Sequence, residues 1–183
     1  MKTMKYLPIL GLLVMLASCK QKEPKQQEHA AKTVVDSALV AEKTPLAKPL
    51  RLENPANEIL LNPYWKLQAA LVESNAFGAR KAALLLEEAA RQVKDKQVIA
   101  QKAAAILQES DLEKQRVHFS TISQELIKLV EMDGVREGAV HVAFCPMAME
   151  DKGAFWLSPE NEVINPYFGA SMLTCGSIEK TIE

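Results

Sequence analysis

Apolar residues recur at three- and four-residue intervals through the middle of the chain, and this period predicts helices. The pattern runs over residues 58–133, is interrupted by short polar breaks, and places the apolar side chains of each segment on one helix face. Because the breaks are short, we expect four helices packed as an up-and-down antiparallel bundle. The expected inward positions are Tyr64, Leu67 and Leu71, then Ala79, Ala82, Ala83, Leu86, Ala90 and Val93, then Ile99, Ala103, Ile106 and Leu107, and finally Leu112, Phe119, Ile122, Leu126, Leu129 and Val130.

Local sequence signals mark where these helices begin and end. Asn62-Pro63 suits the start of the first, because proline is tolerated in the first helical turn. Ser110 to Glu113 has the spacing of a capping box at the start of the longest helix, and Gly134 should end it. Met132, near that end, is expected to belong to the core.

The sequence changes character after Gly134. Val140, Val142 and Phe144 alternate with polar or smaller residues, which is the period of a β-strand. The remaining tail is rich in Gly and Pro turn signals, so we expect an irregular region docked on the bundle. The expected fold is mainly α, an antiparallel bundle of about four helices with a short β and loop segment at its C-terminal end.

The N-terminal residues have the features of an export signal. Lys2 and Lys5 precede an apolar run from Leu7 to Leu16 that is too short for a membrane-spanning helix. The segment Leu16-Ala17-Ser18-Cys19 resembles the lipobox of bacterial lipoproteins. That resemblance implies cleavage before Cys19 and its acylation, palmitate included, and several acyl chains anchor a protein stably.

The lipobox divides the chain into three expected parts. Residues 1–18 would be the signal peptide, residues 19–56 a polar, proline-punctuated tether and residues 57–183 the folded domain. The domain should be lipid-anchored and face the periplasm, with the outer membrane favoured over the inner.

Charge and motifs narrow the classes of function. The net charge of −1 and the lack of clustered Lys and Arg argue against nucleic-acid binding. The sequence contains no nucleophile elbow, zinc-protease motif or phosphate-binding loop, so we expect no enzymatic activity.

Sulfur donors gather in two short motifs of the expected domain. With Cys19 lipidated, two cysteines remain, and each has methionines within four residues of it. Thiolate and thioether ligands select Cu(I) and Ag(I) over harder divalent ions, whereas zinc sites do not use methionine. His141 would share the strand face of Cys145. The candidate ligands are Cys145, Met147, Met172 and Cys175, with His141 and Met149 as further members.

Other interpretations of the same residues stay open. A Cys145–Cys175 disulfide would suit an oxidising compartment and would staple a loop-rich tail. The protein would then be a structural or protein-interaction lipoprotein. Met147 and Met172 could instead fill gaps in the core. Trp156 could cover a bound cation with its ring, although the expected role is a packing anchor.

Four motifs of the tail resemble a bacterial family, domain of unknown function 3347. They are Cys145-Pro146-Met147-Ala148, Lys152 to Leu157, Asn165-Pro166-Tyr167-Phe168-Gly169 and Met172 to Gly176. The resemblance covers about 58–183, and Arg116, Phe119 and Leu126 match the family's last long helix.

This resemblance implies an association with copper and silver efflux. The family includes lipoproteins and the C-terminal module of efflux membrane-fusion subunits. The chain lacks the long hairpin and barrel segments of such a subunit. The resemblance therefore implies a role in heavy-metal tolerance, or in delivery of metal to an efflux membrane-fusion protein as partner.

Overall fold

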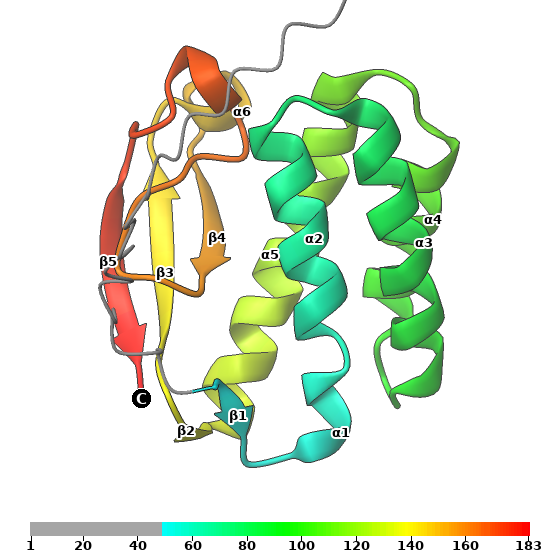
Figure 1. Cartoon of the computed structure of the whole chain (residues 1–183), viewed down its shortest axis with the longest axis vertical. Coiled ribbons are helices and arrows are strands. Elements are labelled where there is room, and N and C mark those ends of the chain that lie inside the picture. Colours follow the sequence, from blue (N-terminus) through cyan, green and yellow to red (C-terminus); the bar gives the residue numbers. More distant parts are fainter. Residues whose placement is uncertain (1–48) are drawn as a thin grey trace, which may run out of the picture. The chain divides into compact units, whose positions relative to one another are not determined.

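The computed structural model describes residues 49–183, and within this part helices and a small sheet are arranged in layers (Figure 1). The predicted signal peptide, Cys19 and most of the predicted tether lie outside the described residues. The helices of the bundle are α2 (Leu61–Val72), α3 (Ala76–Gln92), α4 (Gln97–Gln108) and α5 (Leu112–Asp133), preceded by the short α1 (Pro55–Glu58). The mainly α fold expected from the sequence is confirmed.

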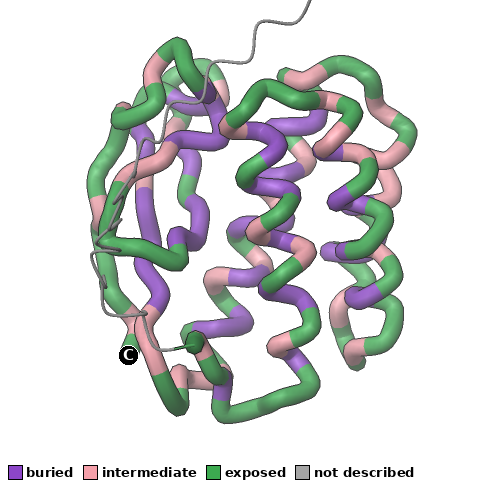
Figure 2. Tube along the Cα trace, viewed as in Figure 1, coloured by how far each residue is buried: buried purple, intermediate pink, exposed green. Residues whose placement is uncertain are grey.

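Successive helices pack in antiparallel pairs, as the short polar breaks predicted. Helix α2 packs on α3, α3 on α4, and α4 on α5 (Figure 1). The inward faces are buried, as the purple segments of Figure 2 show, and Tyr64, Leu67 and Leu71 are fully buried on α2. The three- and four-residue periodicity therefore identified most of the core of the bundle, although Val93, Leu107 and Leu112 are only half-buried.

The helix ends differ in detail from the local sequence signals. Helix α2 begins at Leu61, so Pro63 lies within the first turn, where its missing N–H is not needed. Asp111, rather than Ser110, caps α5, and its carboxylate accepts a hydrogen bond from the Lys114 N–H at 3.1 Å. Gly134 ends α5 at φ +83°, as expected.

The prediction that Met132 belongs to the core is wrong. Its side chain is 86% exposed, whereas Val130 is fully buried on the same helix. Residues two positions apart on a helix are about 200° apart around its axis. Met132 therefore faces away from the residues on which Val130 packs.

A three-stranded antiparallel sheet lies beside the bundle. Its strand order is β4 (Ala154–Ser158), β3 (Val140–Cys145), β5 (Ser177–Ile182), and β4 packs on α5 (Figure 1). The Tyr64 hydroxyl joins the layers, because it lies 2.8 Å from Ser123 Oγ of α5 and accepts the Leu157 N–H of β4 at 3.1 Å.

The C-terminal tail is more regular than the sequence predicted. Only the first strand was expected, yet β4 and β5 complete a sheet. Strand β4 is buried at four of its five positions and β5 has no buried residue, so neither shows the alternation that reveals a half-buried strand.

The folded part also begins earlier than the expected boundary at residue 57. Arg51–Leu52 forms β1, which pairs with β2 (Val135–Glu137) after α5, and Leu52 is fully buried. Among residues 49–183, no helix combines the length and the apolar character that crossing a membrane requires.

Candidate metal-binding site

The two cysteines of the tail meet at one end of the sheet. Cys145 is the buried last residue of β3, and Cys175 is half-buried in the loop before β5. Their Sγ atoms are 2.8 Å apart, and both are free thiols. The hydrogen bond to Cys145, together with burial, raises the pKa of the Cys175 thiol, so its sulfur is protonated at neutral pH.

The distance between these sulfurs lies between the distance in a disulfide and the distance between two sulfurs that bind one cation. A disulfide would bring them to about 2.05 Å. Two sulfurs bound to one cation at about 2.3 Å each would be about 3.8–4.6 Å apart, for bond angles from tetrahedral to linear. From the observed 2.8 Å, the sulfurs would approach by about 0.75 Å to form a disulfide and separate by about 1.0–1.8 Å to bind a cation.

The loop that carries Cys175 is held close to β3 by backbone contacts. Gly176 has φ +131°, and a Cβ atom there would lie 2.4 Å from the Phe144 carbonyl oxygen, so only glycine fits. Fully buried Asn165 donates its side-chain N–H to the Cys175 carbonyl at 2.8 Å, and its backbone N–H to the Leu173 carbonyl at 2.8 Å.

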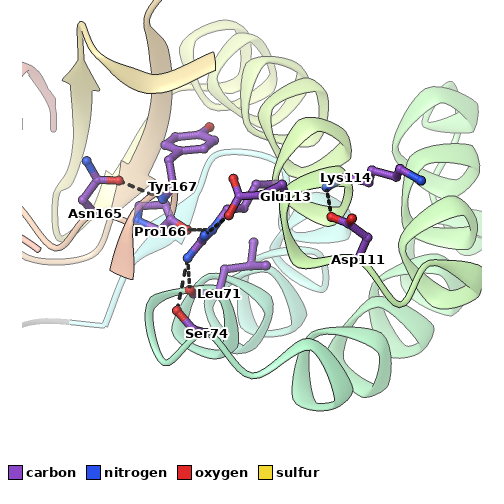
Figure 3. A network of polar contacts seen from close by, with 9 residues as sticks. Leu71, Ser74, Asp111, Glu113, Lys114, Asn165, Pro166 and Tyr167 are labelled. Atoms are coloured by element: carbon purple, nitrogen blue, oxygen red, sulfur yellow. Dashed lines mark hydrogen bonds and ion pairs between the residues drawn. The ribbon is translucent and has the colours of Figure 1, made fainter. Parts of the chain in front are cut away.

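Arg116 of α5 binds this loop to the bundle. Its Nε donates to the Pro166 carbonyl at 2.9 Å, and one Nη donates to the Leu71 carbonyl at 3.2 Å and to Ser74 Oγ at 3.3 Å (Figure 3). The other Nη pairs with the Glu113 carboxylate. The guanidinium is buried. Its charge-assisted hydrogen bonds join the end of α2, helix α5 and the loop after β4.

Tyr167 packs between the helices and the sheet. Its hydroxyl donates to the Phe155 carbonyl at 2.8 Å, and its ring centre lies 5.7 Å from that of Phe119 and 5.9 Å from that of Trp156. Burial raises the pKa of Tyr167, which therefore stays neutral. Trp156 is fully buried in this cluster, which confirms the packing role expected for it.

Three methionines that lie close to Cys145 or Cys175 in the sequence line one groove. Met147, Met149 and Met172 all contribute to an open groove of about 810 Å³, whose wall includes Phe168 and Val117. Met147 is 48% exposed, and Met149 and Met172 are half-buried. Met147 and Met172 are therefore not sealed in the core, which was one interpretation of the sequence.

A left-handed turn carries Met149 and begins two residues after Met147. The segment labelled α6 (Ala148–Asp151) follows Met147, and Met149, Glu150 and Asp151 have φ between +55° and +61°. This conformation costs about 1–2 kcal/mol for each residue that has a Cβ atom, and it is rarely adopted by three in succession. Gly153, at φ +77°, ends the turn and its N–H donates to the Ala148 carbonyl at 2.9 Å.

His141 lies outside this end of the sheet, and its inclusion among the ligands is wrong. It shares a strand face with Cys145, but the two residues are four positions apart along β3, which is about 13 Å. Its Nδ1 lies 2.9 Å from the Thr181 hydroxyl, which explains the polar residue in the strand. The alternation gave the correct face, but ligation also requires the same position along the strand.

The described part of the chain holds no group of three or more His, Cys, Asp and Glu side chains arranged around a metal position. A metal site here would therefore depend on thioether donors. The donor set present, two thiols in contact and three methionines in one groove, fits a soft monovalent cation better than zinc.

The comparison with known families concerns the helical part of the chain. Residues 60–138 match the model of a family described as "Protein of unknown function (DUF3347)". This segment belongs to that family. No curated protein and no solved structure matches the chain.

The DUF3347 segment contains α2 to α5 and ends before β3. It therefore includes Arg116, which holds the sulfur-bearing loop, but not the cysteines or the methionines of the groove. Arg116 was matched to the family from the sequence, but its contacts were not predicted. Its position indicated that it would be buried, because it precedes Phe119 by about one helical turn on the same face of α5.

Proposed function

We propose that this protein is a lipid-anchored periplasmic binding protein for Cu(I) or Ag(I), without catalytic activity. The cation would be held by Cys145 and Cys175, with Met147 and Met172 as thioether ligands. The observation that supports this role is the convergence of the two tail motifs, which brings the thiols into contact beside a groove lined by methionines. Such a protein would serve heavy-metal tolerance or deliver metal to an efflux complex.

The arrangement of the donors suits uptake and release of an ion. Met147 is 48% exposed and Cys175 half-buried, so a cation can reach the donors from solvent, while Cys145 is fully buried. Binding requires the sulfurs to separate by about 1.0–1.8 Å and the thiol protons to leave. Cys145 is fully buried whereas Cys175 is half-buried, so we expect the shift in the Cys175 side chain while its backbone stays held by Asn165.

A second candidate function rests on the short distance between the sulfurs. At 2.8 Å the thiols are close enough to pair, and a disulfide would tie β3 to the loop before β5. The protein would then be a structural or protein-interaction lipoprotein. Thiol titration of protein purified without reductant separates the two functions, because a folded chain with two free thiols favours metal binding.

Competition with a chromophoric Cu(I) chelator tests the proposed function. We expect the reduced full-length chain to bind one Cu(I), and Cys145→Ser or Cys175→Ser to weaken binding at least tenfold, which is about 1.4 kcal/mol. Met132→Leu is the matched control, because Met132 lies on the bundle and is 86% exposed. Equal affinities in all four proteins would show that the thiols are not ligands.

A further inference from the structure

The wall of the methionine groove is formed without the two cysteines. Met147, Met149 and Met172 line the groove together, whereas neither Cys145 nor Cys175 contributes to its wall. The three methionines come from two segments, the turn after β3 and the loop before Cys175. The three methionine side chains therefore share one groove without a contribution from the cysteines.

The charged side chains around the groove are balanced. Glu150 pairs with Lys152 at 3.2 Å and Glu113 pairs with buried Arg116, which leaves Asp151 and Lys114 as opposite charges on the wall. A thioether carries no charge and no proton, so a monovalent soft cation can enter such a groove without displacing a proton.

The backbone around the groove is strained where it presents the methionines. Met149 and the next two residues adopt a left-handed turn, although none is a glycine. Strain of this kind persists only when the surrounding structure holds it, and it is concentrated at ligand clamps and similar sites. Met149 lies in this turn and Met147 precedes it at φ −83°, and both line the same groove as Met172.

We propose that the thioethers of Met147, Met149 and Met172 form a Cu(I) or Ag(I) site of their own, which still binds metal when Cys145 and Cys175 are joined by a disulfide. This inference rests on the proposed function and adds that metal binding persists after the two cysteines are oxidised. A small-molecule disulfide such as oxidised glutathione takes two electrons and two protons from the thiols and leaves as two thiols. The protein disulfide remains, and the methionines keep their lone pairs.

Methyl NMR on the oxidised full-length chain tests this site. The protein carries ¹³C-methyl methionine, is oxidised with glutathione disulfide until no free thiol remains, and is titrated with silver nitrate. We expect the methyl signals of Met147, Met149 and Met172 to shift together, and that of exposed Met132 to stay unchanged as the internal control. Met172→Leu, a volume-conserving change, should weaken silver binding at least tenfold.

The outcomes separate this inference from the proposed function. If the reduced chain binds silver and the oxidised chain does not, the separate site is wrong and thiol ligation stands. If neither form binds, both proposals fail. Equal shifts of all the methionines, Met132 included, would mean unspecific contact with silver and would also overturn the separate site.

Discussion

Replacing Arg116 with methionine should destabilise the domain by about 1–3 kcal/mol. The guanidinium is buried and donates to the carbonyls of Pro166 and Leu71 and to Ser74. Methionine leaves the Pro166 carbonyl without its partner, whereas the Leu71 carbonyl keeps its bond from the Ser74 N–H at 3.1 Å. An apolar side chain therefore cannot make up for the lost hydrogen bonds of Arg116. It can maintain stability when both members of a buried ion pair are replaced together.

Urea unfolding at neutral pH measures this effect, with Arg91→Met as the matched control. Arg91 pairs with Glu87 one turn away on α3, but its side chain is 69% exposed, so its loss should cost less than about 1 kcal/mol. Arg116→Lys should fall between the two, because one ammonium group cannot reach all the acceptors. A free energy of unfolding for Arg116→Met that equals the control's would show that Arg116 does not hold the loop.

The second large effect is expected at Gly169, where alanine should destabilise the domain by about 2–4 kcal/mol. Gly169 begins the short 3₁₀ turn η1 (Gly169–Ser171) at φ +56°. A Cβ atom there would lie 2.6 Å from the Val72 carbonyl oxygen and 2.8 Å from Ser74 Oγ. Because the nearest atom belongs to the backbone of α2, the loop itself must move away from the bundle.

Gly138→Ala is the control for the backbone conformation alone, because Gly138 has φ +83° in the turn between β2 and β3. Thermal unfolding should show a clearly larger loss for Gly169→Ala than for Gly138→Ala. Gly169→Ala should also weaken Cu(I) binding, since the displaced loop carries Met172 and Cys175. Identical losses of stability in the two variants would indicate that the close approach to Val72 is unimportant.

Much of the bundle could be predicted because its signals are local and periodic. The buried faces of α2 and α5 follow the helical period, and Gly134 ends α5 through its own backbone preference. Strand β3 was predicted for the same reason. Strand β5 was not, because it lies at the edge of the sheet with exposed polar residues, and only its pairing with β3 makes it a strand.

The candidate site could be predicted only in part. The sequence placed soft donors in two motifs, and the structure brings Cys145 and Cys175 together. It could not place His141 relative to Cys145, because the side-chain period gives the face of a strand but not the distance along it. The left-handed turn at Met149 had no sequence signal either, since its residues do not favour that conformation.

X-ray absorption at the copper edge, on the reduced full-length chain loaded with one equivalent of Cu(I), tests the central claim most directly. The proposed function predicts a first shell made only of sulfur, at about 2.3 Å. The matched Cys145→Ser and Cys175→Ser double variant should lose part of that shell. A first shell of nitrogen or oxygen at about 2.0 Å, or copper that leaves the chain during gel filtration, would contradict the claim that this domain binds a soft metal ion.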